Sequence, residues 1–452
     1  MKDVQDYSKV DESLIDFKRI AIEAGGLEEE PTREEFYTNY PFFKYWRKDN
    51  NDKLLLTDGI NIYIHIPFCI QICDYCFYMK ELIKSKNQVD EYIDHVCKEM
   101  ALVSEACHLK NRKVNSIYIG GGTPSVLTEQ QFKKLIEALH KHHSIQDAEF
   151  TFEAEPGTFS RSKLEWYKDS GVNRISMGVQ SFDDHIIKLS SRKHTVAQAI
   201  HSIDLVKEAG GFVVNIDLLS GLAGEKPESW DRSVDIALQQ RIDMLTIYKM
   251  KAYANTVFFQ KGVHKDEIEL PSKEQEVAFM KRALQKVDEA GYHRWSTFAF
   301  TRDGLLHRYA ENSWRGGDVI AYGVSSFGKI GNINYQNSNN TPLYFEKINN
   351  GEMPVARTYK LSCKDLIVKE LLLCAARLSS YRKSEFIQKF GFDYFDLIPD
   401  VIGQLVEKGY ITDNREELTL TKQGILFGDY IGKVLASSVK DALGKDAIGF
   451  AY

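Results

Sequence analysis

Short apolar stretches alternate with longer amphipathic ones between Ile60 and about Phe300. The short stretches are rich in β-branched residues, which is typical of buried parallel strands, and the longer ones repeat apolar residues with the period of a helix. We predict strands at Ile60–Ile66, Ser116–Gly120, Glu149–Glu155, Arg174–Val179, Phe212–Leu219, Met244–Tyr248 and His293–Phe298. We predict helices near Gln88–Glu105, Thr128–His142, Ser160–Ser170, Val196–Ala209, Glu228–Gln239 and Ser272–Ala290. Such units, joined by right-handed crossovers, predict an α/β fold, a partial (β/α)6-type barrel.

The same pattern divides the chain into four segments, because periodicity is absent before the first predicted strand and becomes mainly helical after about Thr358. The predicted segments are an N-terminal extension at 1–58, the partial barrel at 59–300, a barrel-capping connection at 301–357 and a helical C-terminal domain at 358–452.

The C-terminal segment resembles a winged helix, because a predicted helix at Ile398–Val406 is followed by GYITDNREELTLTKQG and a last helix. Many winged helices bind DNA, but Asp413, Glu416 and Glu417 put negative charge on the predicted wing, where phosphates would be repelled. We therefore expect a lid over a substrate rather than a DNA-binding module.

The overall charge excludes some classes of partner. The chain has 58 basic and 64 acidic residues, a formal net charge of −6, and no long run of like charges. Phosphate binding needs clustered cations, so we expect no nucleic-acid partner. No apolar run reaches the roughly 18 residues that span a bilayer, and the N-terminus lacks the apolar core of a signal peptide. We therefore expect no transmembrane segment and a cytoplasmic protein.

Three cysteines follow the first predicted strand directly. Cys69, Cys73 and Cys76 form a C-x3-C-x2-C triplet within GINIYIHIPFCIQICDYCFYM. Three thiolates suit an incomplete metal site, because a cubane iron–sulfur cluster has four irons and keeps one of them open to a non-protein ligand. S-adenosylmethionine (SAM) can chelate that iron through its amino and carboxylate groups. We therefore predict a [4Fe-4S] cluster on these cysteines, with SAM as its ligand.

Zinc is the competing metal. Structural zinc usually takes four ligands in paired C-x2-C units, however, and the sequence has no second pair. The other four cysteines are scattered singly on predicted helices, where they are typical core residues: Cys97, Cys107, Cys363 and Cys374. A reducing compartment suits both these thiols and an oxygen-sensitive cluster.

Glycines and carboxylates follow the next two predicted strands. Gly121, Gly122 and Thr123 belong to the run GGGTP, where missing side chains let a ligand approach the backbone. Glu153 and Glu155 close the third strand on the same side, and a carboxylate there could bind an ammonium group or ribose hydroxyls.

Further polar side chains follow the fourth and fifth predicted strands. Gln180 ends the fourth strand, Arg192 follows a short helix, and Asp217 lies in NIDLLSGL on the fifth. A guanidinium suits a carboxylate, and an aspartate suits hydroxyls or an amine. Because parallel strands end at one edge of the barrel, we expect these residues near the cysteines.

At these motifs the chain resembles the HemN-like radical SAM family, from about Tyr37 to the C-terminus. YIHIPFC-x3-C-x-YC is similar to the family's cluster loop, and GGGTP to its cradle for the methionine amino group. The resemblance implies that Glu153 contacts the first SAM and that Gln180, Arg192 and Asp217 contact a second SAM molecule. The full set of cofactor-binding positions it implies is Tyr63, Tyr75, Gly121, Gly122, Thr123, Glu153, Gln180, Arg192 and Asp217.

The sequence departs from the family pattern at three places. GLAGE, at 221–225, lacks the usual proline after its Gly-Leu pair. Lys251 stands where a small residue is expected beside SAM. Tyr78 stands where oxygen-independent coproporphyrinogen III oxidase has a further cysteine. The first two departures concern the second SAM site, and the third argues against that particular oxidase.

The resemblance includes the class C radical SAM methyltransferases, and AYGVSSFGKIGNINYQN at 321–337 is more similar to that branch than to the oxidase. We therefore expect a methyltransferase that uses two SAM molecules to methylate an sp2 carbon of a quinone or heteroaromatic substrate, most specifically C8 of menaquinone. A low-potential electron donor such as flavodoxin or ferredoxin would reduce the cluster. The alternatives are tetrapyrrole chemistry, as oxidation of coproporphyrinogen III or radical heme degradation, and heme binding by a non-catalytic relative.

Overall fold

The computed structural model describes residues 59–443 apart from 376, 379 and 415. The N-terminal extension predicted at 1–58 lies outside the described residues. Within them, a 12-stranded mixed sheet forms the centre of the fold. Its central strands run parallel, in the spatial order β11 (Asp318–Tyr322), β1 (Gly59–Ile66), β4 (Lys113–Gly121), β5 (Glu149–Ala154), β6 (Arg174–Gln180), β7 (Val213–Ser220) and β8 (Met244–Lys249).

Strand β1 shows why both faces of this sheet are covered. Ile60, Ile62 and Ile64 are fully buried on one face. On the other face, Asn61 is buried against the side chain of Ser116 on β4. The two faces therefore separate an apolar outer layer, which packs on helices, from a polar inner layer that lines the barrel.

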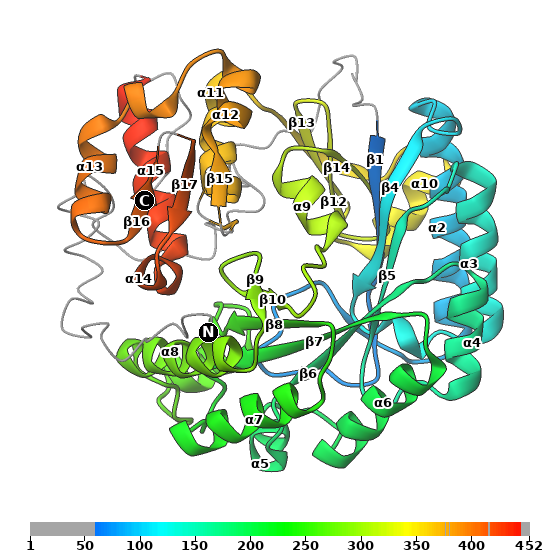
Figure 1. Ribbon diagram of the computed structural model, residues 1–452. Coiled ribbons are helices and arrows are strands. Elements are labelled where there is room, and N and C mark those ends of the chain that lie inside the picture. The colour runs from blue at the N-terminus through cyan, green and yellow to red at the C-terminus, as the bar shows by residue number, and fades with distance from the viewer. Residues whose placement is uncertain (1–58, 376, 379, 415, 444–452) are drawn as a thin grey trace.

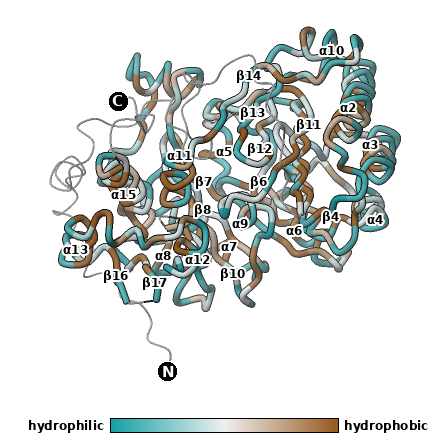
Figure 2. Tube along the Cα trace, turned by 90° about the horizontal axis from the view of Figure 1, so that it is seen from above, coloured by the Kyte–Doolittle hydropathy of each residue, from teal (hydrophilic) through white to brown (hydrophobic). Residues whose placement is uncertain are grey.

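Helices follow the parallel strands and cover the outer face of the sheet (Figure 1). They are α2 (Lys86–Ala106), α3 (Glu129–His142), α4 (Arg161–Asp169), α5 (Asp184–Leu189), α6 (Val196–Ala209), α7 (Pro227–Gln239) and α8 (Lys273–Glu289). Capping boxes at Thr128 and Thr195 start α3 and α6, because each threonine hydroxyl accepts a backbone N–H of the first turn. Figure 2 shows hydrophobic and hydrophilic positions alternating along α2 and α3.

The predicted strands from Ile60 to Tyr248 are present, but the predicted strand at His293–Phe298 is not. The chain there forms β9 (His293–Arg294) and β10 (Ala299–Thr301), and β10 runs antiparallel to β8. A short turn separates β9 from β10, so the pair forms a hairpin rather than another parallel unit. The sheet edges β14 and β9 do not meet, so the α/β partial barrel is confirmed and is not closed.

The other edge of the sheet is built after the barrel. Helix α9 (Arg308–Trp314) leads into β11, and three antiparallel strands extend the sheet beyond it. They are β12 (Phe327–Ile330), β13 (Ile333–Asn337) and β14 (Val355–Lys360), with α10 (Thr341–Asn349) between the last two.

The C-terminal elements are mainly helical and lie beside the opening between the two sheet edges (Figure 1). The helices are α11 (Cys363–Glu370), a π-helical turn (Leu371–Ala375), α12 (Lys383–Phe390), α13 (Pro399–Glu407), α14 (Lys422–Leu426) and α15 (Gly428–Ala442). A small sheet has the order β15 (Ser380–Arg382), β17 (Glu417–Leu420), β16 (Ile411–Asp413). An isolated bridge between Ser296 and Leu378 joins these elements to the barrel rim, and α14 contacts α8.

Candidate active site at the barrel mouth

The cysteine loop leaves β1 at the carboxyl end of the barrel. Cys69 ends β2 (Phe68–Cys69), which pairs with β3 (Glu81–Leu82) and fixes the two ends of the loop. The backbone N–H of Cys76 donates to the carbonyl of Cys73 at 3.1 Å, which closes the turn between these two cysteines. Cys69 is buried, and Cys73 and Cys76 are half-buried. The three thiols therefore lie in one partly shielded loop, as the sequence predicts.

The thiol environment fits a cationic cluster. Burial raises the pKa of Cys69 to about 12 and also raises that of Cys76, so neither thiol ionises near neutral pH without a positive partner. Within the part of the chain that the structure describes, no group of three His, Cys, Asp or Glu side chains converges on a single metal ion. A cubane cluster does not need such convergence, because each thiolate binds a different iron. The donor set therefore suits a [4Fe-4S] cluster better than zinc.

The glycine run lies directly beside this loop. The N–H of Gly122 donates to the carbonyl of Ile66 at 2.7 Å, and that of Thr123 donates to the carbonyl of Phe68 at 2.8 Å. A Cβ at Gly122 would lie 2.7 Å from a backbone carbon of Pro67, so only glycine fits there. The run thus holds the β4 end against the chain entering the cysteine loop.

Glu153 lies in the polar inner layer of the barrel. Its carboxylate accepts the Tyr118 hydroxyl at 2.5 Å and the N–H of Gly121 at 2.9 Å. Burial raises the pKa of Glu153 to about 7, although both hydrogen bonds oppose that rise. The ring of Tyr63 packs on Tyr118, with 6.1 Å between the centroids. A cationic ammonium group would favour the ionised form of this carboxylate, as the predicted contact with SAM requires.

Arg192 is the most highly connected residue of the predicted set. Its Nη1 lies 2.8 Å from the Tyr75 hydroxyl and 3.5 Å from the Sγ of Cys73. Its Nη2 donates to the carbonyl of Gly178 at 2.6 Å and lies 3.2 Å from Oε1 of Glu155. The guanidinium thus joins the cysteine loop to the ends of β5 and β6.

The remaining predicted residues come from β6 and β7. Gln180 has φ of 69° at an irregularity of the β6–β7 pairing, a conformation that non-glycine residues rarely adopt. Asp217 accepts the Asn215 amide at 2.8 Å and the Ser176 hydroxyl at 3.4 Å. Gly178 pairs with Asp217 in the sheet, and its carbonyl accepts a hydrogen bond from Arg192. These residues therefore share one side of the barrel mouth.

Two partners of the predicted residues were not identified from the sequence. Glu155, expected only to be a further carboxylate, forms the ion pair with Arg192 and lies 3.2 Å from the Thr123 hydroxyl. The second partner is Tyr118, whose hydroxyl donates a hydrogen bond to the Glu153 carboxylate. Alternation along β4 gives a signal for Tyr118, because this residue lies on the same face as Ser116 and Gly120. No sequence pattern pairs Glu155 with Arg192 across the barrel.

The segment GLAGE is closed by its own glutamate. Oε2 of Glu225 accepts the N–H of Gly221 at 2.6 Å, and burial raises the pKa of Glu225 to about 8. Leu222 and Ala223 pack in a small apolar cluster with Ile186 and Phe258. The alanine that stands where the family has proline thus packs in this apolar cluster, and a hydrogen bond within the segment closes it.

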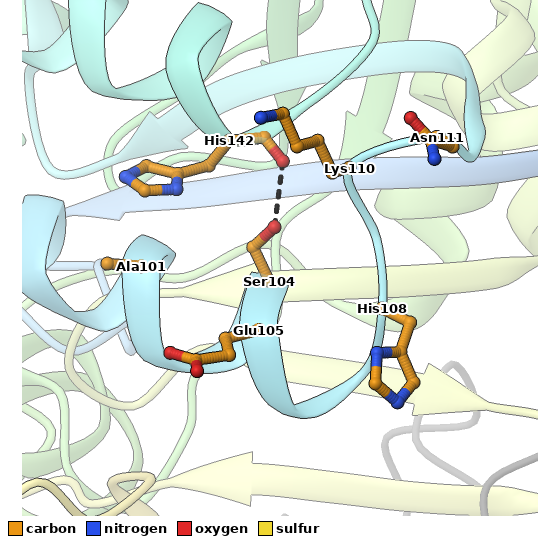
Figure 3. A pocket seen from close by; sticks show the side chains of 7 residues that line it. All are labelled: Ala101, Ser104, Glu105, His108, Lys110, Asn111 and His142. Carbon is orange, nitrogen blue, oxygen red and sulfur yellow. Dashed lines mark hydrogen bonds between the residues drawn. The ribbon is translucent and has the colours of Figure 1, made fainter.

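A separate cavity of about 470 Å³ lies between the ends of α2 and α3 (Figure 3). It is open, and the side chains that line it are Ala101, Ser104, Glu105, His108, Lys110, Asn111 and His142. It holds none of the predicted site residues, so the barrel mouth remains the candidate site.

Within the described residues, no helix is long and apolar enough to cross a membrane.

Comparison with known proteins supports the same assignment. The radical SAM superfamily model matches residues 63–237. The heme chaperone HemW of Bacillus subtilis is 30% identical over 371 residues, which cover 82% of this chain and 97% of the relative. Oxygen-independent coproporphyrinogen III oxidase of Pseudomonas aeruginosa is 27% identical over 390 residues, covering 81% and 83%. The solved structure of coproporphyrinogen III oxidase (HemN) from Escherichia coli shares the fold, with a TM-score of 0.78, 22% identity and coverage of 89% and 97%.

These comparisons overturn the expected activity. Heme chaperones and coproporphyrinogen III oxidases match over most of the chain, so the prediction of a methyltransferase acting on menaquinone is wrong. The segment at 321–337, on which the methyltransferase branch was chosen, therefore does not identify the branch. The alternative with a tetrapyrrole ligand agrees better with these relatives.

The cofactor prediction is confirmed at the level of the family, because radical SAM proteins bind a [4Fe-4S] cluster and SAM. Cys69, Cys73 and Cys76 would hold the cluster, and the glycine run beside them would receive SAM. When bound, the cluster supplies one electron to SAM. The chain belongs to the radical SAM superfamily, in the HemN-like family that contains HemW and coproporphyrinogen III oxidase.

Proposed function

We propose that this chain binds heme through a radical SAM scaffold and acts as a heme chaperone. One observation carries the proposal: the match to the heme chaperone of Bacillus subtilis extends over 97% of that protein, at 30% identity. The match covers 82% of this chain, so it extends well beyond the segment 63–237 that matches the superfamily model. In this role the chain takes up heme and passes it to an acceptor protein.

The cluster loop supports this proposal over porphyrinogen oxidation. Tyr78 occupies the position at which the oxidase has a further cysteine, and it is 51% exposed at the barrel mouth. An exposed aromatic ring next to the cluster cysteines offers a planar ligand a surface for stacking.

Oxidative decarboxylation of a porphyrinogen is the second candidate. The observation that favours it is the cluster of SAM-type residues, because Glu153, Arg192 and Asp217 all lie at the barrel mouth near the cysteine loop. Under this candidate Arg192 and Asp217 serve a second SAM molecule, and flavodoxin or ferredoxin reduces the cluster. The reaction would convert propionate side chains of coproporphyrinogen III to vinyl groups with loss of carbon dioxide. The hydrogen atom would go to the 5′-deoxyadenosyl group of SAM, and the remaining electron to an external electron acceptor.

One anaerobic experiment separates the two candidates. The reconstituted protein is titrated with heme, and its Soret band is followed before and after addition of an apo-hemoprotein. The same preparation is incubated with coproporphyrinogen III, SAM and a reductant, and the porphyrins are analysed by mass. Saturable heme binding with transfer, and no loss of carbon dioxide from the porphyrinogen, supports the chaperone. Carbon dioxide loss supports the oxidase, and absence of both results contradicts the tetrapyrrole proposal.

A further inference from the structure

Cationic side chains gather where the end of β8 meets the C-terminal elements. Lys249 ends β8, and its Nζ donates to the carbonyl of Leu426 in α14 at 2.6 Å. Lys251 follows two residues later. Arg377 lies just before β15, with its Nη2 at 4.0 Å from Oδ1 of Asp429 in α15. This corner therefore lies between the carboxyl end of a barrel strand and the first turn of the last helix.

The pKa of Asp429 reflects the positive charges around it in this corner. Burial alone would raise the pKa of Asp429, yet the charges of Lys251, Arg377 and Lys249 lower it to about 2. The opposing carboxylates are too few to neutralise these cations, because beside Asp429 only Glu276 is among the groups that act on Lys249. The corner is therefore positive and attracts anions.

Lys251 is the exposed cation of this corner, whereas Lys249 and Arg377 are half-buried. Lys251 forms no hydrogen bond or ion pair with any residue that the structure describes. Lys249, in contrast, is tied to α14. Lys251 is also the residue that departs from the family pattern, and SAM binding gives no reason for a lysine there.

Aromatic rings form a wall beside these cations. The rings of Tyr248 and Phe298 lie 5.2 Å apart, and those of Phe298 and Trp314 lie 5.7 Å apart. The Arg377 guanidinium lies 5.7 Å from the Phe298 centroid. Tyr248 is 43% exposed, so part of its ring is available to a ligand.

The segment that follows Lys251 contacts the cluster loop. The ring of Phe77, next to Cys76, lies 4.3 Å from that of Tyr253. Asn255 donates to the carbonyl of Phe77 at 3.3 Å. The segment after Lys251 thus connects the cationic corner to the cysteine loop.

We propose that Lys251 and Arg377 bind the carboxylate side chains of a tetrapyrrole whose ring lies against Tyr248 and Phe298. The inference rests on the proposed function, because it assigns the ligand's anionic groups within the same site. A guanidinium binds a carboxylate through paired hydrogen bonds, an ammonium group adds a point charge, and a large planar ring stacks on aromatic faces. The ring would then face the barrel mouth, with its carboxylates turned to the C-terminal elements.

The test uses the full-length protein with its cluster reconstituted, titrated with heme and with heme dimethyl ester in the same detergent. The variant Lys251→Glu reverses the exposed charge, and Lys110→Glu is the matched control in the distant cavity of Figure 3. We expect Lys251→Glu to weaken heme binding at least tenfold and to leave binding of the ester unchanged. Lys110→Glu should bind both ligands as the unchanged protein does.

Two results distinguish the inference from the function on which it rests. If the unchanged protein does not bind heme, the proposed function is wrong, and the inference falls with it. If that protein binds heme and Lys251→Glu binds it equally tightly, or loses heme and ester to the same extent, then the carboxylate assignment is wrong while heme binding stands. Arg377→Lys, which keeps the charge but loses the paired hydrogen bonds, should weaken heme binding less than Lys251→Glu does.

Discussion

Nη2 of Arg192 lies 3.2 Å from Oε1 of Glu155, and both side chains are largely buried at the barrel mouth. The same guanidinium lies 3.5 Å from the Sγ of Cys73. The residue predicted to bind a second SAM molecule is therefore an ion-pair partner that also fixes the position of the cysteine loop. Any ligand that binds Arg192 has to share it with Glu155.

The ion pair should show a measurable coupling energy. Arg192→Met leaves a buried carboxylate with only Thr123 and His194 nearby, so this variant should lose about 2–4 kcal/mol of unfolding free energy. Glu155→Gln should lose less, because Arg192 keeps its bond to the Gly178 carbonyl. Urea unfolding of both variants and the double variant should give a coupling above about 1 kcal/mol. Additive losses would show that the pair is not an energetic unit.

Cys73→Ala should abolish formation of the [4Fe-4S] cluster and leave the fold intact. Cys73 is only half-buried, so its loss creates little cavity. Iron and sulfide analysis after anaerobic reconstitution measures the cluster, and circular dichroism measures the fold. Cys97→Ala, a half-buried thiol on α2, is the control and should keep a full cluster. A full iron content in the Cys73 variant would contradict the cluster assignment.

The sequence predicts the parallel strands well because their chemistry is local. Ile60–Ile66 is apolar and β-branched, and that is sufficient to identify a buried strand whatever its neighbours are. The pairing of β1 with β11 could not be predicted, because no local signal in Asp318–Tyr322 identifies a partner so distant in the chain. The antiparallel β10 was missed for a related reason, since three residues carry no readable period.

In the candidate site, too, residues with a local sequence signal could be predicted, and contacts between distant segments could not. The cysteines and the glycine run were identified because their spacing within one loop is itself the signal. The ion pair of Glu155 was not, because Arg192 reaches this carboxylate from a different strand end. The reaction could not be predicted either, because cluster and SAM motifs describe the cofactors and not the ligand on which they act.

Gly121→Ala should destabilise the barrel mouth more than a glycine replacement elsewhere. Gly121 has φ of 116°, and a Cβ there would lie 2.5 Å from the His65 ring. We expect a loss of about 2–4 kcal/mol, from backbone strain and from the clash. Gly171→Ala is matched, because φ is 87° and the space is open, and it should lose only about 1 kcal/mol. Urea unfolding measures both, and equal losses would show that the His65 contact is unimportant.

Glu99 should make stability depend on pH. Burial raises the pKa of Glu99 from 4.5 to about 7, against hydrogen bonds from Tyr344 and the Gly323 N–H. The folded protein therefore keeps a proton that the unfolded chain releases. This contribution, about 3 kcal/mol, is complete below about pH 4.5 and is lost as the pH rises to about 7.

The variant Glu99→Gln isolates this effect, because its side chain cannot release a proton. Thermal unfolding of both proteins should show the unchanged protein losing stability relative to the variant as the pH rises from about 5 to about 7. Curves that stay parallel over this range would show that Glu99 is ionised in the folded protein throughout.

The pairing of β1 with β11 constrains how the chain can fold during synthesis. The Asn61 amide donates to the Asp318 carbonyl at 3.0 Å, across a separation of 257 residues. One edge of β1, with its row of isoleucines, therefore has no native partner while the intervening barrel units emerge from the ribosome. Contacts of such separation form late and slowly, and an uncovered apolar strand edge is prone to wrong pairing with other chains. The strand that carries the cluster loop is thus among the first to be synthesised and among the last to be completed.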